Sequence, residues 1–378
     1  MLHVKIVKDF LFKNINQLAT VAEKRTVMPI LTNLLLNAKD DQLIITATDL
    51  EVTFVGAYPA QVIEAGQMTV YAKTFVEVIR SIKADELILK QTANLSLELY
   101  HGSGHTTFYG KSPDDFPPPP SFENVNLIEI YSADLIDAID KTIFSCSTEE
   151  TSYNLSGIEF LKEEKEPNSG VQVLRLVSSD SQRLNVATIE SSEIDSLDLP
   201  TPIIVPRKGL EELKKLAEST DSKIKIGATP ANMVAKTDNA ALIIRLASGD
   251  FPDYTKVIPQ EFDYTIVANR LSLLDTIKII SPLAAQKYKQ SKFLFSKDLL
   301  TINYSNPELG ETEQSVGIEY SGPELIKGFN CKFYQEVLMA MKSENIHISF
   351  KENKVTWLVT GPEDRGYLGL IISMDVNS

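Results

Sequence analysis

The sequence predicts an α+β fold of three tandem, similar domains, each with two helices backed by antiparallel sheets. Three observations support this prediction: one helical pattern occurs three times, its copies start about a third of the chain apart, and strand-rich sequence follows each copy. The chain has 378 residues. This length is enough for roughly two to four domains of ordinary size, each able to bury its own core.

The repeated helix begins at Lys73, Lys208 and Lys332 and reads KTFVEVIRSIK, KGLEELKKLAE and KFYQEVLMAMK. Apolar residues at steps of three and four place one face of each copy in the core, and the Lys and Glu residues on the solvent side. The fifth residue is Glu in every copy, at positions 77, 212 and 336. A period this long excludes a solenoid and indicates tandem domains of one kind.

Further landmarks recur in step with this helix. Another amphipathic segment precedes each copy, starting at residues 8, 132 and 269, and the motif DDFP is echoed later by GDFPDY. After the first segment, apolar runs flank an Asp-Asp pair that we interpret as a turn between strands. We interpret the Pro-containing stretches 116–126 and 252–262 as linkers, rather than as ligands for a polyproline-binding domain. The expected domains are therefore 1–121, 127–252 and 254–378.

The composition is that of an ordinary soluble protein, with 43% hydrophobic and 23% charged residues. The opening MLHVKIVKDF has charges too early for a secretory signal, and no apolar run approaches the ~18 residues of a membrane span. Cys146 and Cys331 are far apart, which favours a reducing compartment. We expect a cytoplasmic protein with no membrane partner.

Little in the sequence resembles a catalytic site. The histidines are scattered, two of them in the hairpin-like HGSGH, and there is no phosphate loop, dinucleotide-binding turn or nucleophile elbow. Asp49 and Glu51 alternate with Leu50 along an expected strand, and we interpret them as a solvated or turn-capping pair rather than an acid/base pair. We expect a protein that is not an enzyme, with no cofactor and no metal site.

Three similar domains without a catalytic site suggest a scaffold protein, which acts through its shape rather than through a reaction. If two helices per domain line a ring, six helices about 8 to 10 Å apart enclose a hole of roughly 8 Å, which is too narrow for a DNA duplex. Twelve helices enclose roughly 20 to 28 Å. A ring that threads a duplex therefore requires two chains arranged head to tail.

Five stretches occur in an order typical of one family: RTVMPILTNLLL (25–36), TATDLEV (46–52), VPRKGLEEL (205–213), FPDYTKVIP (251–259) and YSNPE (304–308). They closely resemble the β subunit of bacterial DNA polymerase III, the replicative sliding clamp. The resemblance implies the DNA clamp fold, a ring-shaped homodimer that slides on duplex DNA without sequence preference. It also implies partners that bind through short peptide motifs: the polymerase III α subunit, the clamp loader, other polymerases and repair proteins.

Basic residues on the expected inner wall are candidates for contacts with DNA phosphates, which are independent of sequence. The net charge is −14, so we expect positive potential only on that wall. The resemblance adds Arg25, which matches a family loop residue that touches DNA, and we include Tyr153 as a further candidate. The repeated helices supply Lys73, Arg80, Lys83, Arg207, Lys208, Lys215 and Lys332.

The resemblance also implies a hydrophobic peptide-binding groove between the second and third domains. Apolar side chains with a few polar anchors suit an apolar peptide. The candidate positions are Leu155, Ser179, Ser181, Gln182, Arg183, Leu184, Pro252, Lys256, Val257, Tyr288, Asn330, Phe333, Thr356, Leu370, Ile371, Ile372, Ser373 and Met374.

The chain departs from the family pattern in this groove. Ser181 and Gln182 stand where the family commonly has Gly-His, and Ser373 and Asp375 stand where it has Pro and Arg. A permissive glycine, a titratable ring and a basic rim residue are therefore lost. We expect an altered partner preference. The alternative hypothesis is a monomeric peptide-binding scaffold without ring closure.

Overall fold

The computed structural model describes residues 1–12, 15–22, 27–92, 94–149, 153–199, 201–220, 222–284 and 290–375, with only the backbone of residue 153. Two compact units are found. The first contains Met1–Ile136, Ser191–Thr201 and Val205–Leu246, and the second contains Asp137–Glu190, Pro202–Ile204 and Ala247–Ser378. The central repeat therefore contributes to both units.

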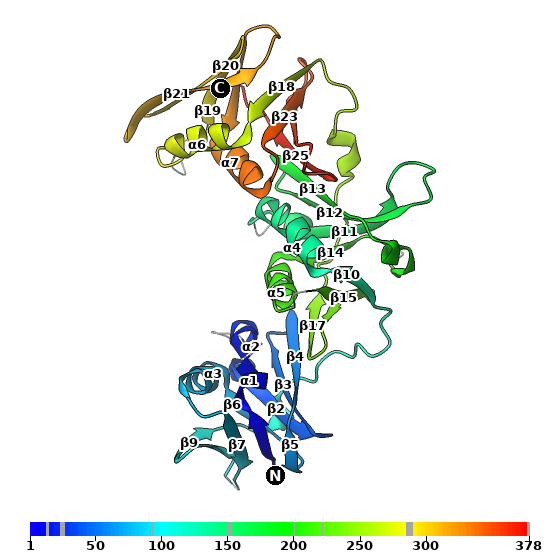
Figure 1. The fold of residues 1–378 in the computed structure, drawn as a ribbon, viewed down its shortest axis with the longest axis vertical. Helices are drawn as coiled ribbons and strands as arrows, with labels where there is room; N and C mark the ends of the chain where they lie inside the picture. The colour runs from blue at the N-terminus through cyan, green and yellow to red at the C-terminus, as the bar shows by residue number, and fades with distance from the viewer. Residues whose placement is uncertain are drawn as a thin grey trace. The chain divides into compact units, whose positions relative to one another are not determined.

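The first unit is built on two antiparallel sheets (Figure 1). One has the strand order β5-β1-β7-β8-β9 and the other the order β10-β15-β16-β17-β4-β3-β2-β6. The strands are β1 (His3–Val7), β2 (Asn33–Lys39), β3 (Gln42–Thr48), β4 (Val52–Pro59), β5 (Gln61–Glu64), β6 (Gly66–Tyr71), β7 (Glu86–Gln91), β8 (Ser96–His101), β9 (Gly104–Tyr109), β10 (Ile128–Tyr131), β15 (Lys223–Ala228), β16 (Asn232–Lys236) and β17 (Ala240–Arg245).

The second unit is built on one long sheet, with the order β14-β11-β12-β13-β25-β24-β23-β18-β21-β20-β19-β22. Strand β14 (Ile203–Pro206) begins in this unit and continues into the first. The other strands are β11 (Gly157–Glu164), β12 (Gln172–Ser179), β13 (Arg183–Ile189), β18 (Tyr264–Asn269), β19 (Gln290–Ser296), β20 (Leu299–Asn306), β21 (Gly310–Glu319), β22 (Leu325–Asn330), β23 (Asn345–Phe350), β24 (Thr356–Thr360) and β25 (Tyr367–Ile372).

Helices cover these sheets as the sequence predicts. In the first unit α2 packs on β3 and β4 beside α5, which packs on β17; in the second unit α6 packs against α7 and β21 (Figure 1). None of the helices in the described residues has the length and apolar character needed to cross a membrane. The helices are α1 (Lys8–Phe12), α2 (Ile15–Val21), α3 (Ala72–Ser81), α4 (Ser132–Asp140), α5 (Arg207–Glu218), α6 (Arg270–Ile280) and α7 (Cys331–Ala340).

The threefold repeat of the helix is confirmed in α3, α5 and α7. Phe75, Leu210 and Tyr334 occupy the same position of the three copies and are all buried. The expected solvent-facing position is right for Glu77, which is exposed, and wrong for Glu212, which is only 6% exposed. Helical periodicity identifies the face toward a helix's own sheet, but it cannot reveal a second neighbour that covers the opposite face.

That neighbour is α2. The Gln17 amide of α2 donates a hydrogen bond to the Glu212 carbonyl (2.7 Å), and the Thr20 hydroxyl donates to the Glu212 carboxylate (3.1 Å). Lys215 lies one turn further along α5 and pairs with the same carboxylate at 2.6 Å. These contacts supply the partners that a buried charge requires.

Two predicted turns are confirmed and one strand is shorter than expected. Asp40 and Asp41 form the turn between β2 and β3 with left-handed φ angles of 50° and 54°, and Gly102 (φ 58°) forms the hairpin turn of HGSGH. Asp49 lies in a turn rather than along a strand, since β3 ends at Thr48. Its Oδ1 accepts hydrogen bonds from Glu51 N in the turn (2.9 Å) and from Val52 N at the start of β4 (2.7 Å), which makes it a turn-capping residue.

Each of the two expected linkers has an aromatic side chain that packs on an apolar cluster. Phe116 packs on Ile30 and Leu31 in the first unit. Its counterpart Phe251 packs with Tyr254 on the long sheet of the second unit. The repeated motif found in the sequence therefore marks the points where each linker is fixed to a sheet, and in the second unit this contact forms the candidate site.

Candidate functional site

The second unit contains a cavity of about 180 Å³ beside the second linker. Nine of its lining residues were predicted from the sequence: Leu155, Ser179, Ser181, Arg183, Leu184, Pro252, Val257, Leu370 and Ile372. Phe251, Asp253 and Tyr254 complete the lining and were missed. The recurrence of Phe116 as Phe251 in the DDFP and GDFPDY motifs was the available signal, but it gave no indication of which residues face the cavity, and Asp253 and Tyr254 have no counterpart in the first motif.

Strand register places the apolar floor of the cavity. Leu184 of β13 lies opposite Leu370 of β25, and Leu370 lies opposite Leu358 of β24, so these side chains share one face of the sheet. Tyr254 is 8% exposed and packs with Leu184 and Leu370 in one apolar cluster. Tyr254 begins a short 3₁₀ helix, Tyr254–Val257, and Val257 at its end remains 48% exposed. The cavity thus has a buried floor and an open apolar wall, as an apolar anchor residue requires.

Other predicted groove residues lie outside the cavity lining. Ile371 is fully buried on the opposite face because neighbours in a strand alternate, so the prediction that it lines the groove is wrong. Thr356 pairs with Ile372 across β24 and β25. The Gln182 carbonyl accepts a hydrogen bond from Ile372 N, and Lys256 pairs with Asp253 at 3.0 Å.

The remaining predicted positions lie at the end of the chain and at the start of α7. Ser373 N donates to the Val355 carbonyl (2.7 Å), and Met374 pairs with Gly328 through the backbone. The Asn330 side chain caps α7 by accepting a hydrogen bond from Lys332 N (3.1 Å). Tyr288 lies outside the described residues.

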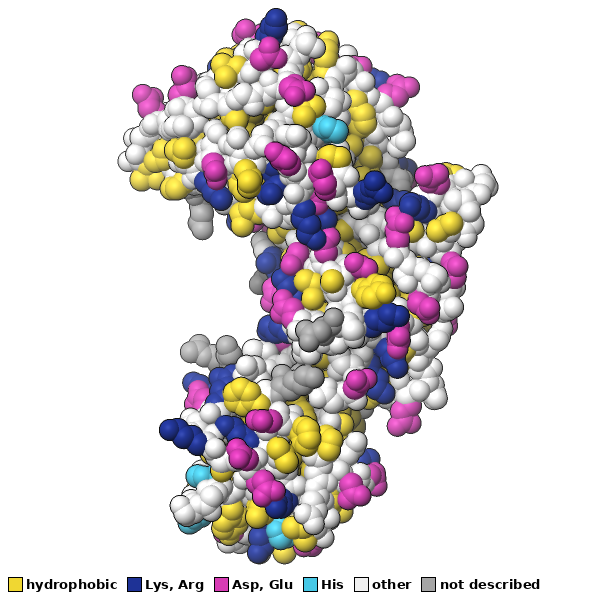
Figure 2. All heavy atoms as spheres, in the orientation of Figure 1, with side chains coloured by type: hydrophobic (Ala, Val, Ile, Leu, Met, Phe, Trp, Pro, Cys, Tyr) yellow, Lys and Arg dark blue, Asp and Glu magenta, His cyan; other side chains and the backbone are white. Residues whose placement is uncertain are grey.

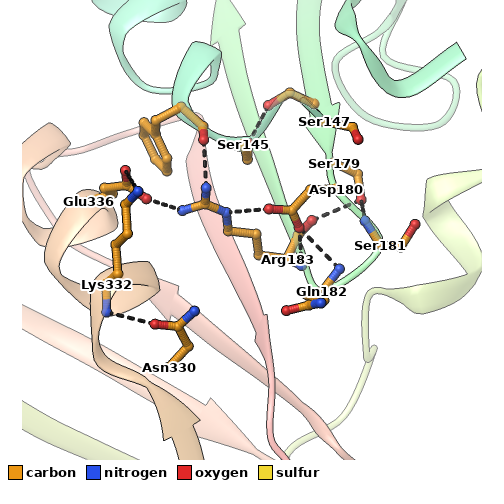
Figure 3. A network of polar contacts seen from close by, with 12 residues as sticks. Ser145, Ser147, Ser179, Asp180, Ser181, Gln182, Arg183, Asn330, Lys332 and Glu336 are labelled. Carbon is orange, nitrogen blue, oxygen red and sulfur yellow. Dashed lines mark hydrogen bonds and ion pairs between the residues drawn. The ribbon is translucent and has the colours of Figure 1, made fainter. Parts of the chain in front are cut away.

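Arg183 links the cavity to α7 (Figure 3). Its side chain is 6% exposed and is surrounded by acceptors: Asp180 at 2.9 Å, the Phe144 carbonyl at 2.6 Å, and the Glu336 carboxylate. The guanidinium also lies 4.3 Å from the ring centre of Phe333. Two carboxylates, a carbonyl and an aromatic face together offset the cost of burying this charge.

Ser181 at the edge of the cavity has a left-handed backbone conformation, and it stands where the family pattern commonly has glycine. Its φ is 70°, in the left-handed region that L-residues disfavour. Its N–H donates to the Ser179 hydroxyl at 3.1 Å. The turn at Ser181 is therefore formed without glycine, at a conformational cost.

Some of the residues predicted to contact DNA form ion pairs with carboxylates of the same chain, and others, in the part of the chain that the structure describes, do not. Arg207 pairs with Glu211 (3.3 Å), Lys332 with Glu336 (3.8 Å) and Lys208 with Asp49. Arg80 donates to Asn16, whereas Lys73 and Lys83 are exposed and form no ion pair within the described residues. Arg25 and the Tyr153 side chain lie outside the described part.

Surface charge is mixed on the face that Figure 2 shows, where Lys and Arg side chains are interspersed with Asp and Glu. Among the described residues no group of three His, Cys, Asp or Glu side chains is placed to hold a metal. Burial raises the pKa of the Cys331 thiol to about 11, which makes it a poor nucleophile.

Comparison with known proteins agrees with this description. Residues 2–120, 129–253 and 255–375 match the N-terminal, central and C-terminal domain families of the DNA polymerase III beta subunit. The β sliding clamp of Pseudomonas aeruginosa is 30% identical over 359 residues, which cover 95% of each chain. The β sliding clamp of Caulobacter vibrioides is 28% identical over 98% of this chain and 99% of its own.

Solved structures give the same result. The DNA polymerase sliding clamp of Caulobacter crescentus superposes with a TM-score of 0.92 at 27% identity, covering 100% of both chains. The polymerase III β subunit of Pseudomonas aeruginosa superposes with a TM-score of 0.90 at 28% identity, covering 99% of this chain and 100% of its own. The chain belongs to the bacterial DNA polymerase III β subunit family, the DNA sliding clamps.

Proposed function

We propose that this chain closes with a second copy into a ring around duplex DNA and tethers polymerases to it. The observation that supports ring closure is how the repeats join within one chain. β17, the last strand of the second repeat, pairs antiparallel with β4 of the first repeat. β25, the last strand of the third repeat, pairs antiparallel with β13 of the second. β4 and β13 hold the same place in the order of their repeats, so both joints follow one rule.

The strands that would form a third joint are open. β9, the last strand of the first repeat, ends its sheet. In β21, which corresponds to β4 and β13, residues 310–317 pair only with β20 within the described part of the chain. By the rule of the internal joints, β9 of one copy pairs with β21 of another. Each copy offers one of each strand, so two copies make two joints and close head to tail.

Exposed apolar side chains lie beside both open strands. Tyr109 on β9 is 83% exposed, Leu309 before β21 is 56% exposed, and Ile279 of α6, the helix that packs on β21, is 56% exposed. Light scattering tests this joint. We expect a dimer for the natural chain and monomers for Tyr109→Asp and Ile279→Asp. Val171→Asp, at an exposed apolar site in the β11–β12 hairpin, serves as the control and should leave the dimer intact.

Retention on circular DNA tests encirclement. The protein, placed on a nicked plasmid by a clamp loader, should persist on the closed circle at high salt and leave when the plasmid is linearised. Salt-sensitive loss at equal rates from circle and line would indicate ordinary electrostatic binding and would contradict the ring.

The cavity of the second unit supports the tethering role, in which apolar peptide anchors of the polymerase III α subunit, the clamp loader, other polymerases and repair proteins dock there. A Caulobacter crescentus β sliding clamp has polyethylene glycol bound at a candidate β-motif tethering region, and a Bartonella birtlesii sliding clamp is bound to griselimycin. We propose that griselimycin occupies the same cavity here. Val257→Asp, which puts a charge on the open wall, should abolish binding, and Val171→Asp should not.

A non-catalytic, cytoplasmic role as a processivity factor is consistent with this proposal. The monomeric scaffold considered as an alternative is not favoured, because the full-length relatives are sliding clamps. A dimer that fails to stay on circular DNA would contradict encirclement while leaving the groove in place.

A further inference from the structure

A buried carboxyl group lies on the sheet that carries the groove. Glu159 of β11 is 7% exposed, and among the described residues no hydrogen-bond or ion-pair partner is found for its carboxyl group. Its cross-strand partner is Val177 of β12, so both side chains share one face of the sheet. Val177 belongs to the apolar cluster of Tyr254, Leu184 and Leu370 beneath the groove. Glu159 therefore lies at the margin of the core on which the groove wall rests.

The groups that face this carboxyl come from three elements. Glu163, two residues on from Leu161, shares the face of β11 with Glu159, and Arg175 of β12 pairs with Glu163. From the linker, Tyr254 and Asp253 approach the same cluster. Burial, followed by the nearby carboxyl groups, raises the pKa of Tyr254 to about 12 against an opposing effect of Arg175. The only facing cation in this set is already engaged by Glu163.

An ionised Glu159 would be a desolvated charge beside a like charge, which is costly without a partner. Burial, and then repulsion by Glu163, raise the pKa of Glu159 to about 7. The group thus changes charge close to neutral pH. Glu159 lies opposite Val177, which packs with Tyr254 in one cluster, and the Glu159 carboxyl is among the groups that raise the pKa of Tyr254. Ionisation of Glu159 therefore places a charge that requires water beside the core on which Tyr254 packs.

We propose that Glu159 is a positioning residue for the groove: its neutral form keeps Tyr254 and the wall of residues 252–257 seated on the sheet, and its ionised form loosens that wall. The inference rests on the groove function proposed above. An apolar ligand binds the seated wall, since Pro252, Tyr254 and Val257 line the cavity together. By reciprocity, ligand binding favours the protonated carboxyl, and affinity falls as pH rises.

Calorimetric titration with griselimycin at about pH 6 and about pH 8 tests this coupling. We expect binding to weaken severalfold at the higher pH, by at most about tenfold per pH unit because one proton is linked. Near neutral pH, binding should take up protons, which is visible as a dependence of the heat on the buffer. Glu159→Gln should bind equally at both pH values and as tightly as the natural chain does at the lower one.

Two further variants make the result specific. Glu163→Gln removes the neighbouring negative charge and frees Arg175, so the change in affinity should move to lower pH. Glu164→Gln, on the same strand but hydrogen-bonded to Asn168 N in the exposed hairpin, should keep the natural profile. A flat profile for the natural chain, or an unchanged one for Glu159→Gln, would refute the role of Glu159. Absence of griselimycin binding at every pH would instead contradict the groove function.

Discussion

Arg183 of β13 and Glu336 of α7 form an ion pair that joins the central repeat to the third repeat within the second unit. Glu336 is one of the three glutamates that occupy the fifth position of the repeated helix. Glu77 is exposed, Glu212 is buried against α2, and Glu336 holds a buried arginine. One sequence position therefore has three different environments. We expect the effect of a substitution on stability to depend on which of the three copies carries it.

Replacing these glutamates by glutamine should reveal that difference. We expect Glu336→Gln to lower the free energy of unfolding by roughly 1–3 kcal/mol, because Arg183 loses one of its two carboxylates. Glu212→Gln should cost a similar amount. Glu77→Gln is the matched control and should change stability by less than about 0.5 kcal/mol in urea unfolding. Equal effects at all three positions would contradict the observed burial.

Asp364 should make the second unit sensitive to acid. This carboxylate is 2% exposed, pairs with Lys141 at 3.0 Å and accepts from Ser343 N (2.9 Å) and Ser343 Oγ (2.7 Å). Burial alone would raise its pKa, but the hydrogen bonds from Ser343 and Lys141 outweigh this and lower the pKa below 3.8.

A lowered pKa means that the folded state binds the proton less tightly than the unfolded state does. The stabilisation is therefore present above about pH 4 and is lost as the pH falls through the folded-state pKa. Asp364→Asn should lower the melting temperature at pH 7, and the difference from the natural chain should shrink below about pH 4. A constant difference from about pH 7 down to about pH 3 would contradict the pairing.

Glu159 should have the opposite dependence. Its pKa is raised from 4.5 to about 7, so the folded state retains the proton after the unfolded state has lost it. Stability should then fall as pH rises through this window, by an amount on the order of 2–3 kcal/mol. Glu159→Gln should remove most of this loss in urea unfolding at matched pH. A natural chain whose stability rises with pH over this range, with Glu159→Gln unchanged, would contradict the burial of the carboxyl.

Ser181→Gly should stabilise the chain, because φ at this position is 70°. Glycine adopts this region without a Cβ penalty, so we expect a gain of up to about 1 kcal/mol. Gly102→Ala gives the reverse test: the glycine has φ of 58° and open space around its Cβ direction, so only the backbone cost should appear. Thermal melting of both variants measures this. A loss of stability in Ser181→Gly would indicate that the Ser181 side chain contributes more than its backbone costs.

The lysines of the repeated helices should separate into two groups in DNA binding. Lys73 and Lys83 are exposed without an ion pair among the described residues, so Lys73→Gln and Lys83→Gln should each reduce the salt dependence of duplex binding by about one phosphate contact. Lys208→Gln should instead lower stability, because its ammonium pairs with the buried carboxylate of Asp49. Salt-dependent binding and urea unfolding distinguish these results. A DNA-binding defect in Lys208→Gln with unchanged stability would contradict the assignment.

The sequence alone determined the repeat, the helix face that enters the core, the turns at Asp40-Asp41 and HGSGH, and most of the cavity lining. These features depend on periodicity, turn chemistry and a family pattern, all of which are local in the chain. The end of β3 at Thr48 was not predicted, because a strand boundary depends on tertiary contacts.

Only the tertiary structure decided how the remaining side chains are used. Leu370 and Ile372 line the cavity while Ile371 is buried behind them, because strand register fixes which alternate residues face the linker. Glu212 and Arg183 contact segments distant in sequence, and their electrostatic roles follow from those neighbours. Charge, unlike periodicity, depends on what surrounds a residue in space, and that information is not present in any local stretch of the chain.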